Sequence, residues 1–397
     1  RDIPASTALQ ELQQLDGWGA LQSAVATAQI GDRELSAFQL AASRVVFASL
    51  TTGAGRGVVV GAGTGSGKTL AFYLPAFAAM ADHALPHRYR LRTLALYPRK
   101  ELLRDQLRDA VVTARLVAKE VRAADRRPLR IGALYGATPK SDADRSFNDE
   151  GAWRRHDRGL ICPYFTCPGA DAPTGPECRG DLVWWDSDRR QHRERLRCAA
   201  CGMAFDGDVA VTRGSRRGRL PYLLFATTEM LNRTASSRLG RMMGWRGAPA
   251  PNLVLLDEVH TYSGVHGAQV ALLLRRWRND VQSPVTFVGL SATLRDAGAF
   301  FSQLTGLPEA RVDHIAPTAD ELRPEGREYA IALRGDPVSG TSLLSTSIQA
   351  AMLFGRVLDR DTDQYLYGST GFVFTDDLDV TNRFYDNLRD AEGRQDR

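Results

Sequence analysis

The chain has 397 residues, of which 43% are hydrophobic and 24% are charged, and its formal net charge is +5. This composition is ordinary for a globular enzyme, the length leads us to expect two units, and the mild positive charge suits a polyanionic partner. The longest apolar run, Leu70–Ala81, is too short to span a bilayer, and no export signal opens the chain. We therefore expect a cytoplasmic protein without a membrane span.

Short β-rich runs alternate with helical stretches along the chain. Continuous apolar strands of this kind predict an α/β fold with a doubly wound parallel sheet, covered by helices on both faces. Ligands of such sheets bind beyond the carboxyl ends of the strands. The predicted strands are Gly57–Gly61, Arg92–Tyr97, Arg130–Tyr135, Tyr222–Ala226, Asn252–Leu256, Thr286–Gly289 and Gly371–Thr375.

A glycine-rich turn follows the first predicted strand and opens a helix. Closely spaced backbone N–H groups in such a turn, together with the helix N-terminus, suit phosphate oxygens. Lys68 would reach the β- and γ-phosphates of ATP, and the Thr69 hydroxyl would ligate Mg²⁺. The other loop residues that we predict to bind the nucleotide are Gly63, Thr64, Gly65, Ser66 and Gly67.

Residues 151–220 interrupt the alternation of strands and helices, and they hold all five cysteines. The segment is rich in Arg, Pro and Gly and lacks periodicity, so we predict that it is an insertion. Its arginines and the pair Trp184-Trp185 suit single-stranded nucleic acid. A solvated charged face over a small tryptophan core explains the same residues equally well.

The cysteine spacing is typical of a metal site. Cys198 and Cys201 form a C-x-x-C knuckle, which aims two thiolates at one ion, and Cys167 and Cys178 resemble a stretched second knuckle. We predict that these four residues hold a structural Zn²⁺ ion. Cys162 is an alternative to Cys167, and five reduced cysteines without a metal are the alternative to any such site.

An acidic pair follows the predicted strand Asn252–Leu256. Asp257, directly after the strand, would hold Mg²⁺, and Glu258 would orient and deprotonate the attacking water. Because the pair lies downstream of a phosphate-binding turn, it predicts a site of ATP hydrolysis.

In this order, the motifs resemble those of the superfamily 2 helicases, and further motifs extend the resemblance over most of the chain. The resemblance implies two RecA-like domains in tandem, the second only begun here, and an ATP-driven motor that acts on nucleic acid. Gln39 would read the adenine edge, and His260 completes the DExH form of the acidic motif. The residues that would grip the nucleic-acid backbone are Pro98, Arg99, Lys100, Thr227, Thr228 and Glu229. The residues that would couple the state of the bound ATP to this grip are Ser291, Ala292 and Thr293. The run Gly371–Thr375 resembles a motif at the start of the second domain.

The segment Asp257–Gly267, followed by Arg275-Arg276, resembles the MrfA group of DNA helicases, which includes DrmA-type antiviral defence helicases. This resemblance implies DNA as the partner and a place in genome defence or repair, and it leaves room for a partner subunit. Two alternatives stay open. One is an RNA-remodelling helicase of the same superfamily, because contacts to phosphates do not distinguish the two nucleic acids. The other is a P-loop nucleotide switch whose zinc-stabilised insertion binds a protein.

These positions predict the domain organisation. An N-terminal extension covers residues 1–34, and the first RecA-like ATPase domain covers residues 35–315, with the cysteine-rich insertion at 151–220 inside it. A connector and the start of the second RecA-like domain occupy residues 316–397.

Overall fold

The computed structural model divides into two compact units, Arg1–Leu322 and Arg323–Arg397. The residues that it describes are 3–63, 65–86, 90–144, 153–169, 177–213, 220–247, 250–281, 283–292, 294, 296–321, 331–332, 343–358, 369–375 and 377–393. None of the helices in these ranges combines the length and apolarity that a membrane span requires.

The first unit is built on an eight-stranded sheet with the strand order β13-β1-β12-β11-β2-β10-β3-β9. Each neighbouring pair is parallel, which confirms the predicted parallel sheet. Six predicted runs form strands in it, whereas β9 and β13 were not predicted. The strands are β1 (Gly57–Gly61), β2 (Thr93–Tyr97), β3 (Ile131–Leu134), β9 (Val209–Ala210), β10 (Leu223–Thr227), β11 (Leu253–Leu256), β12 (Thr286–Ser291) and β13 (Val312–Ile315).

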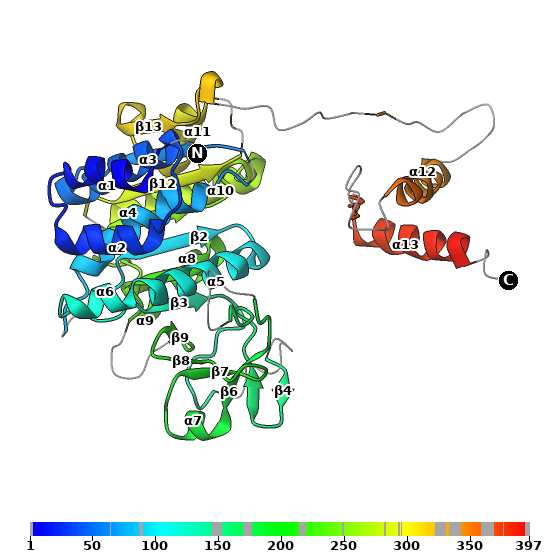
Figure 1. Cartoon of the computed structure of the whole chain (residues 1–397), viewed down its shortest axis with the longest axis horizontal. Coiled ribbons are helices and arrows are strands. Elements are labelled where there is room, and N and C mark those ends of the chain that lie inside the picture. The colour runs from blue at the N-terminus through cyan, green and yellow to red at the C-terminus, as the bar shows by residue number, and fades with distance from the viewer. Residues whose placement is uncertain are drawn as a thin grey trace. The chain divides into compact units, whose positions relative to one another are not determined.

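Helices flank this sheet (Figure 1). They are α1 (Ala5–Gln13), α2 (Ala20–Ile30), α3 (Ala37–Thr52), α4 (Lys68–Asp82), α5 (Lys100–Leu116), α6 (Ala118–Ala123), α8 (Thr228–Thr234), α9 (Arg238–Met242), α10 (Gly264–Val281) and α11 (Ala297–Thr305). Near the N-terminus, α1 packs on α2, and α2 and α3 pack on α4. The Trp18 and Phe47 rings meet edge to face at 4.6 Å between centroids, which joins the loop between α1 and α2 to α3.

The core of the first unit lies between the sheet and its helices. The side chains of Phe287, Trp277 and Phe301 are fully buried there. Gly289, in the interior strand β12, lets Phe301 approach closely, because a Cβ atom at this position would lie 2.6 Å from that ring. Close packing of this kind fixes the sheet from which the site residues project.

The cysteine-rich segment forms a second sheet, which Figure 1 shows as a lobe beside the β3–β9 edge of the main sheet. Its order is β4-β5-β6-β7-β8, with antiparallel pairing throughout. The elements are β4 (Arg155–His156), β5 (Gly159–Ile161), β6 (Leu182–Trp185), α7 (Asp186–Arg190), β7 (Arg195–Cys198) and β8 (Ala204–Asp206). The main sheet resumes at β9, within the range 151–220 that the sequence assigned to the insertion.

The tryptophan pair of the insertion divides between core and surface. Trp184 is fully buried and packs 6.0 Å from Trp153. Trp185 is only partly buried, and the guanidinium groups of Arg197 and Arg158 lie 4.0 Å and 5.4 Å from the centre of its ring. Trp184 therefore belongs to a small tryptophan core, as the structural interpretation of this pair expected, and is not exposed to stack on a base.

The second unit contains α12 (Leu343–Val357) and α13 (Leu378–Gly393), which pack on each other. The strand predicted at Gly371–Thr375 is wrong, because these residues form no regular element. No strand occurs among the described residues of this unit, and an isolated strand has no partner for its backbone N–H and C=O groups.

Candidate functional site

The glycine-rich turn lies between β1 and α4, where the sequence predicted a turn between a strand and a helix. Gly65 and Gly67 adopt left-handed backbone conformations, with φ of +76° and +79°, which a residue with a Cβ atom rarely adopts. Lys68 Nζ donates to the carbonyl oxygens of Ala62, at 2.6 Å, and Gly63, at 3.0 Å. Burial lowers the pKa of the Lys68 ammonium group, and the nearby carboxylates of the acidic pair oppose this shift. Thr64 lies outside the described residues.

The acidic pair follows β11 directly. Asp257 is 9% exposed, and burial raises the pKa of its carboxyl group to about 6. Its Oδ1 accepts a hydrogen bond from the backbone N–H of Glu258 at 2.9 Å. Glu258 has a left-handed φ of +48°, a conformation that costs about 1–2 kcal/mol for a residue with a side chain and that clusters at functional sites. The structure therefore holds both carboxylates in defined places at the end of one strand.

His260 links the acidic pair to the end of β12. Its Nδ1 lies 3.3 Å from Glu258 Oε2 and 3.4 Å from Ser291 Oγ. Ser291 is fully buried and is the last residue of β12, and Ala292 follows it, partly buried. The structure thus brings together His260 and the first of the predicted coupling residues. Thr293 lies outside the described residues.

Gln39 lies beside the glycine-rich turn rather than on an open surface. Its side chain is 1% exposed, its Oε1 accepts from the backbone N–H of Ser36 at 2.9 Å, and its Nε2 donates to the Gly67 carbonyl at 2.9 Å. The first bond belongs to a capping box at the start of α3, which needs Ser and Gln at this spacing. Gln39 therefore positions the turn in this structure, and the predicted contact with adenine would require these bonds to break.

Gly267, the last residue of the segment Asp257–Gly267, has a packing role. A Cβ atom on Gly267 would lie 2.1 Å from the carbonyl oxygen of Tyr262. Only glycine therefore lets α10 begin so close to the turn after the acidic pair, and it places His266, whose ring stacks on Tyr262 at 6.0 Å, near the neighbouring cavity.

A cavity of about 740 Å³ lies at the carboxyl ends of β2, β10 and β3. We call it the groove. Four residues that we predicted to grip nucleic acid line it, namely Pro98, Thr227, Thr228 and Glu229. Thr227 caps α8, because its Oγ1 accepts from the Met230 N–H at 3.2 Å. Arg99 is exposed at the N-cap of α5, outside the residues that line the groove, and Lys100 is the first residue of that helix.

The loop that follows β3 was not predicted from the sequence to belong to the site. Its residues Tyr135, Gly136 and Ala137 line the groove. This loop is held from the ends of the insertion, since Trp153 Nε1 donates to the Ala137 carbonyl at 2.8 Å and Arg213 donates to that of Gly136 at 2.8 Å. The position of these residues at the carboxyl end of a predicted strand was a signal that could have identified them.

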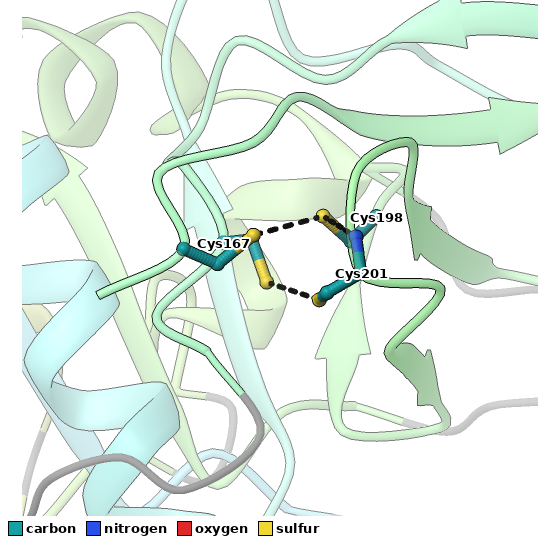
Figure 2. A group of neighbouring side chains, drawn as sticks. Cys167, Cys198 and Cys201 are labelled. Carbon is teal, nitrogen blue, oxygen red and sulfur yellow. Dashed lines mark hydrogen bonds between the residues drawn. The ribbon is translucent and has the colours of Figure 1, made fainter. Parts of the chain in front are cut away.

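Four cysteines gather in the insertion, and Figure 2 shows three of them turned toward one another. They are Cys167, Cys178, Cys198 and Cys201, and their sulfur atoms all lie within 4.8 Å of one another. The Cys167–Cys201 and Cys178–Cys198 sulfur pairs are 3.7 Å and 3.6 Å apart. Tetrahedral Zn²⁺, with Zn–S bonds of about 2.3 Å, separates its ligand sulfurs by about 3.8 Å, so this set fits the ion.

The fifth cysteine stands apart from this cluster. Cys162 is buried and lines the groove, and burial raises the pKa of its thiol to about 12. The structure therefore favours Cys167 over Cys162 as the fourth ligand.

Comparison with known proteins agrees with this arrangement. Residues 41–146 match the family DEAD/DEAH box helicase. Over these residues the chain is similar to a DEAD/DEAH box helicase domain. The resemblance to superfamily 2 helicases in the sequence is thereby confirmed, and the acidic pair and the groove extend the site beyond the matched residues.

The helicase domain has relatives among known proteins. Druantia protein DruE of Escherichia coli (strain UMEA 4076-1) is 27% identical over 320 residues, which are 68% of this chain and 17% of DruE. The ATP-dependent helicase YprA of Bacillus subtilis (strain 168) is 29% identical over 132 residues, which are 32% of this chain and 16% of YprA. The chain therefore spans less than a fifth of the length of these relatives.

Two solved structures share the fold of the helicase domain. The Mycobacterium smegmatis helicase Lhr, bound to ssDNA and AMP-PNP, has a TM-score of 0.53 at 17% identity, over 96% of this chain and 37% of Lhr. The DUF1998 helicase MrfA has a TM-score of 0.51 at 17% identity, over 96% of this chain and 42% of MrfA. The predicted RecA-like fold class is confirmed by these structures.

Proposed function

We propose that the protein is an ATP-driven motor that moves along DNA or separates its strands. The observation that carries this proposal is the order of the sheet. The predicted nucleotide-binding residues follow β1 and β11, the predicted coupling residues lie at the end of β12 between these strands, and the groove begins at the next strand, β2. A nucleotide switch without a motor would not need a groove with strand-gripping residues beside the acidic pair.

The residues of the first site have the chemistry that ATP hydrolysis requires. Lys68 binds the β- and γ-phosphates, and Glu258 orients the attacking water and accepts its proton. Thr69 and Asp257 would hold Mg²⁺, which neutralises charge on the phosphates when bound. The 3.3 Å contact between Glu258 and His260, and that of His260 with Ser291, would transmit the change at the γ-phosphate to the rest of the domain.

DNA is the substrate that we propose, because of the resemblance to MrfA-type DNA helicases and because Lhr, which shares the fold, was solved with ssDNA. The same resemblance supports a role in genome defence or repair, in the cytoplasm and with room for a partner subunit. An RNA-remodelling activity is the outcome of the test below that would replace this proposal.

We also propose that the tetracysteine cluster holds a structural Zn²⁺ ion. Four thiolates complete the coordination of the ion and leave no open position for a substrate, so the ion stabilises the insertion and takes no part in hydrolysis. Purified protein should contain about one zinc per chain by mass spectrometry, and a zinc-free protein that keeps the same fold would contradict the assignment.

The motor proposal is tested by measuring ATP hydrolysis with no nucleic acid, with single-stranded DNA, with duplex DNA and with RNA of matched sequence. We expect DNA to stimulate hydrolysis and Lys68→Ala to abolish it with every substrate. Stimulation by RNA alone would assign the protein to the RNA remodellers. No stimulation by any nucleic acid would contradict the motor.

A further inference from the structure

We propose that the insertion supplies one wall of the DNA groove, and that the tetracysteine cluster holds this wall in place. This inference rests on the proposed function and extends it, because it gives the zinc site a task. The occupant is a single DNA strand, bound through its phosphates.

The wall consists of residues 161–166, from the last residue of the strand β5 to the residue before Cys167, the first cysteine of the cluster. Five of these six residues line the groove, together with Arg154 and Asp181 of the same lobe. The other side of the cavity comes from the main sheet and α8, where our predicted strand-gripping residues lie. A cavity of about 740 Å³ falls in the range of about 300–1,000 Å³ that accommodates molecules of nucleotide size.

The wall is anchored at both ends to the segment that directly follows Cys178 of the cluster. The Cys162 N–H donates to the Leu182 carbonyl at 2.7 Å, and the Cys167 N–H donates to the Gly180 carbonyl at 2.9 Å. A Cβ atom on Gly180 would lie 2.8 Å from Cys198 Sγ, so the cluster closes directly on this backbone. Thr166, which faces the groove, immediately precedes the ligand Cys167. Loss of the metal would therefore free the end of the wall.

The interior of the wall adds a contact with the main domain. Between its two ends, Tyr164 is fully buried and its hydroxyl donates to the Val211 carbonyl at 2.6 Å. Phe165 packs edge to face on Phe205 at 5.7 Å, and the guanidinium group of Arg115 from α5 lies 4.9 Å from the Phe205 ring. These contacts give the wall a fixed place beside α5.

The charges around the groove suit a phosphodiester chain. Three arginines from three elements line it, namely Arg104 of α5, Arg233 of α8 and Arg154 of the insertion. Arg154 is 70% exposed and lies 4.0 Å from Asp181, and Arg233 is 65% exposed and lies 3.4 Å from Glu229. Exposed ion pairs of this kind contribute at most about 1 kcal/mol, so phosphates can replace the carboxylates as partners.

The first test compares two arginines of the same lobe. Arg154→Ala removes a guanidinium group that lines the groove, whereas Arg190→Ala makes the same change on α7, which Figure 1 places at the far tip of the insertion. Binding of a fluorescent single-stranded DNA is measured by anisotropy over a range of salt concentrations. We expect Arg154→Ala to weaken binding about tenfold and to reduce the salt slope by about 0.7, and Arg190→Ala to change neither.

The second test addresses the cluster. Cys201→Ser should lose the bound zinc, measured by mass spectrometry, and should weaken DNA binding at least as much as Arg154→Ala does. Hydrolysis of ATP without DNA should stay at the wild-type rate, because the nucleotide residues lie on other strands.

Either result can overturn the inference separately from the motor proposal. If the wild-type protein binds DNA but Arg154→Ala binds it as tightly as Arg190→Ala does, the insertion is no wall of the groove. If Cys201→Ser loses zinc and keeps its DNA affinity, the cluster does not hold the wall. If the wild-type protein itself binds no DNA, the proposed function fails first.

Discussion

The carboxyl ends of the strands form one edge of the main sheet, and its two halves are built in different ways. We call the ends of β1, β12 and β11 the nucleotide half, and the ends of β2, β10 and β3 the groove half. Around β1, β12 and β11, the site residues come from the few positions that follow each strand. Around β2, β10 and β3, the same kind of strand end supplies only part of the groove, and the insertion supplies the rest. The first half is therefore encoded by short local motifs, whereas the second half is assembled by tertiary structure.

The halves also differ in how they hold charge. Asp257 is buried with a raised pKa, and Glu258 has a strained backbone, which would fix both groups before the hydrolysis that we propose. Two arginines of the groove, Arg154 and Arg233, are exposed, and each lies near a single carboxylate. Chemistry requires charges that do not move, and a motor that steps along a strand requires contacts that exchange.

The largest effect is expected from Glu258→Gln. This change removes the proposed base but keeps the size and polarity of the side chain, so kcat for ATP hydrolysis should fall about 10²–10⁴-fold while ATP still binds. Glu309→Gln makes the same change at an exposed position of the short helix Glu309–Arg311 and should leave kcat as it is. Equal rates in the two variants would contradict the role of Glu258.

The anchoring of the insertion predicts the next effect. Glu194 and Arg130 form an ion pair in which the side chains are 14% and 7% exposed. Glu194→Ala leaves the buried Arg130 without this carboxylate, so the free energy of unfolding should fall by about 3–5 kcal/mol in chemical denaturation. Glu11→Ala, which breaks an exposed pair with Arg44, should cost at most about 1 kcal/mol. If Glu194→Ala lowers the free energy of unfolding by less than about 1 kcal/mol, the Glu194–Arg130 pair does not anchor the insertion to the main sheet.

The buried carboxyl group of the nucleotide half predicts a dependence of stability on pH. The pKa of Asp257 is about 6 in the folded protein, against an ordinary value of 3.8 for an aspartate in water, so folding favours the protonated form. Without metal, the buried Asp257 carboxylate therefore destabilises the folded state fully above about pH 6. Below about pH 4 the group is protonated in both states, and this destabilisation is lost. Asp257→Asn should raise the free energy of unfolding by about 3 kcal/mol at pH 7 and by nothing at about pH 3.5. An equal gain at both pH values would contradict this cause.

The smallest effect concerns the link between the halves. Ser291→Ala removes the 3.4 Å contact with His260, and a single hydrogen bond contributes about 1 kcal/mol. We expect the ratio of DNA-stimulated to unstimulated hydrolysis to fall about fivefold. Ser302→Ala, in α11, serves as the matched control and should keep the ratio. An unchanged ratio in Ser291→Ala would remove the His260–Ser291 contact from the coupling.

The nucleotide half could be predicted from the sequence because its information is local. A strand, a glycine-rich turn and a helix start are adjacent in the chain, and Lys68 and Asp257 each follow an apolar run. The same apolar runs identified six strands of the sheet. The strand β13 escaped because it is only partly buried at the sheet edge and includes Asp313 and His314, so no continuous apolar run marks it.

The groove could be predicted only in part. The strand-end residues Pro98 and Thr227 were identified, but the wall at 161–166 was not, because antiparallel pairing within the insertion decides where it lies. For the same reason, the sequence left open the role of the Trp184-Trp185 pair and the choice between Cys162 and Cys167 as a metal ligand. Burial of Trp184 and the position of Cys162 outside the cluster depend on contacts between residues far apart in the chain.

The most direct test of the proposed motor is a titration of ATP hydrolysis with single-stranded DNA at saturating ATP, repeated at several salt concentrations. We predict that the rate rises to a plateau, and that the DNA concentration at half-stimulation increases steeply with salt because phosphates are bound by arginines. A rate that is the same at every DNA concentration would contradict the central claim that the two halves of this sheet edge act together.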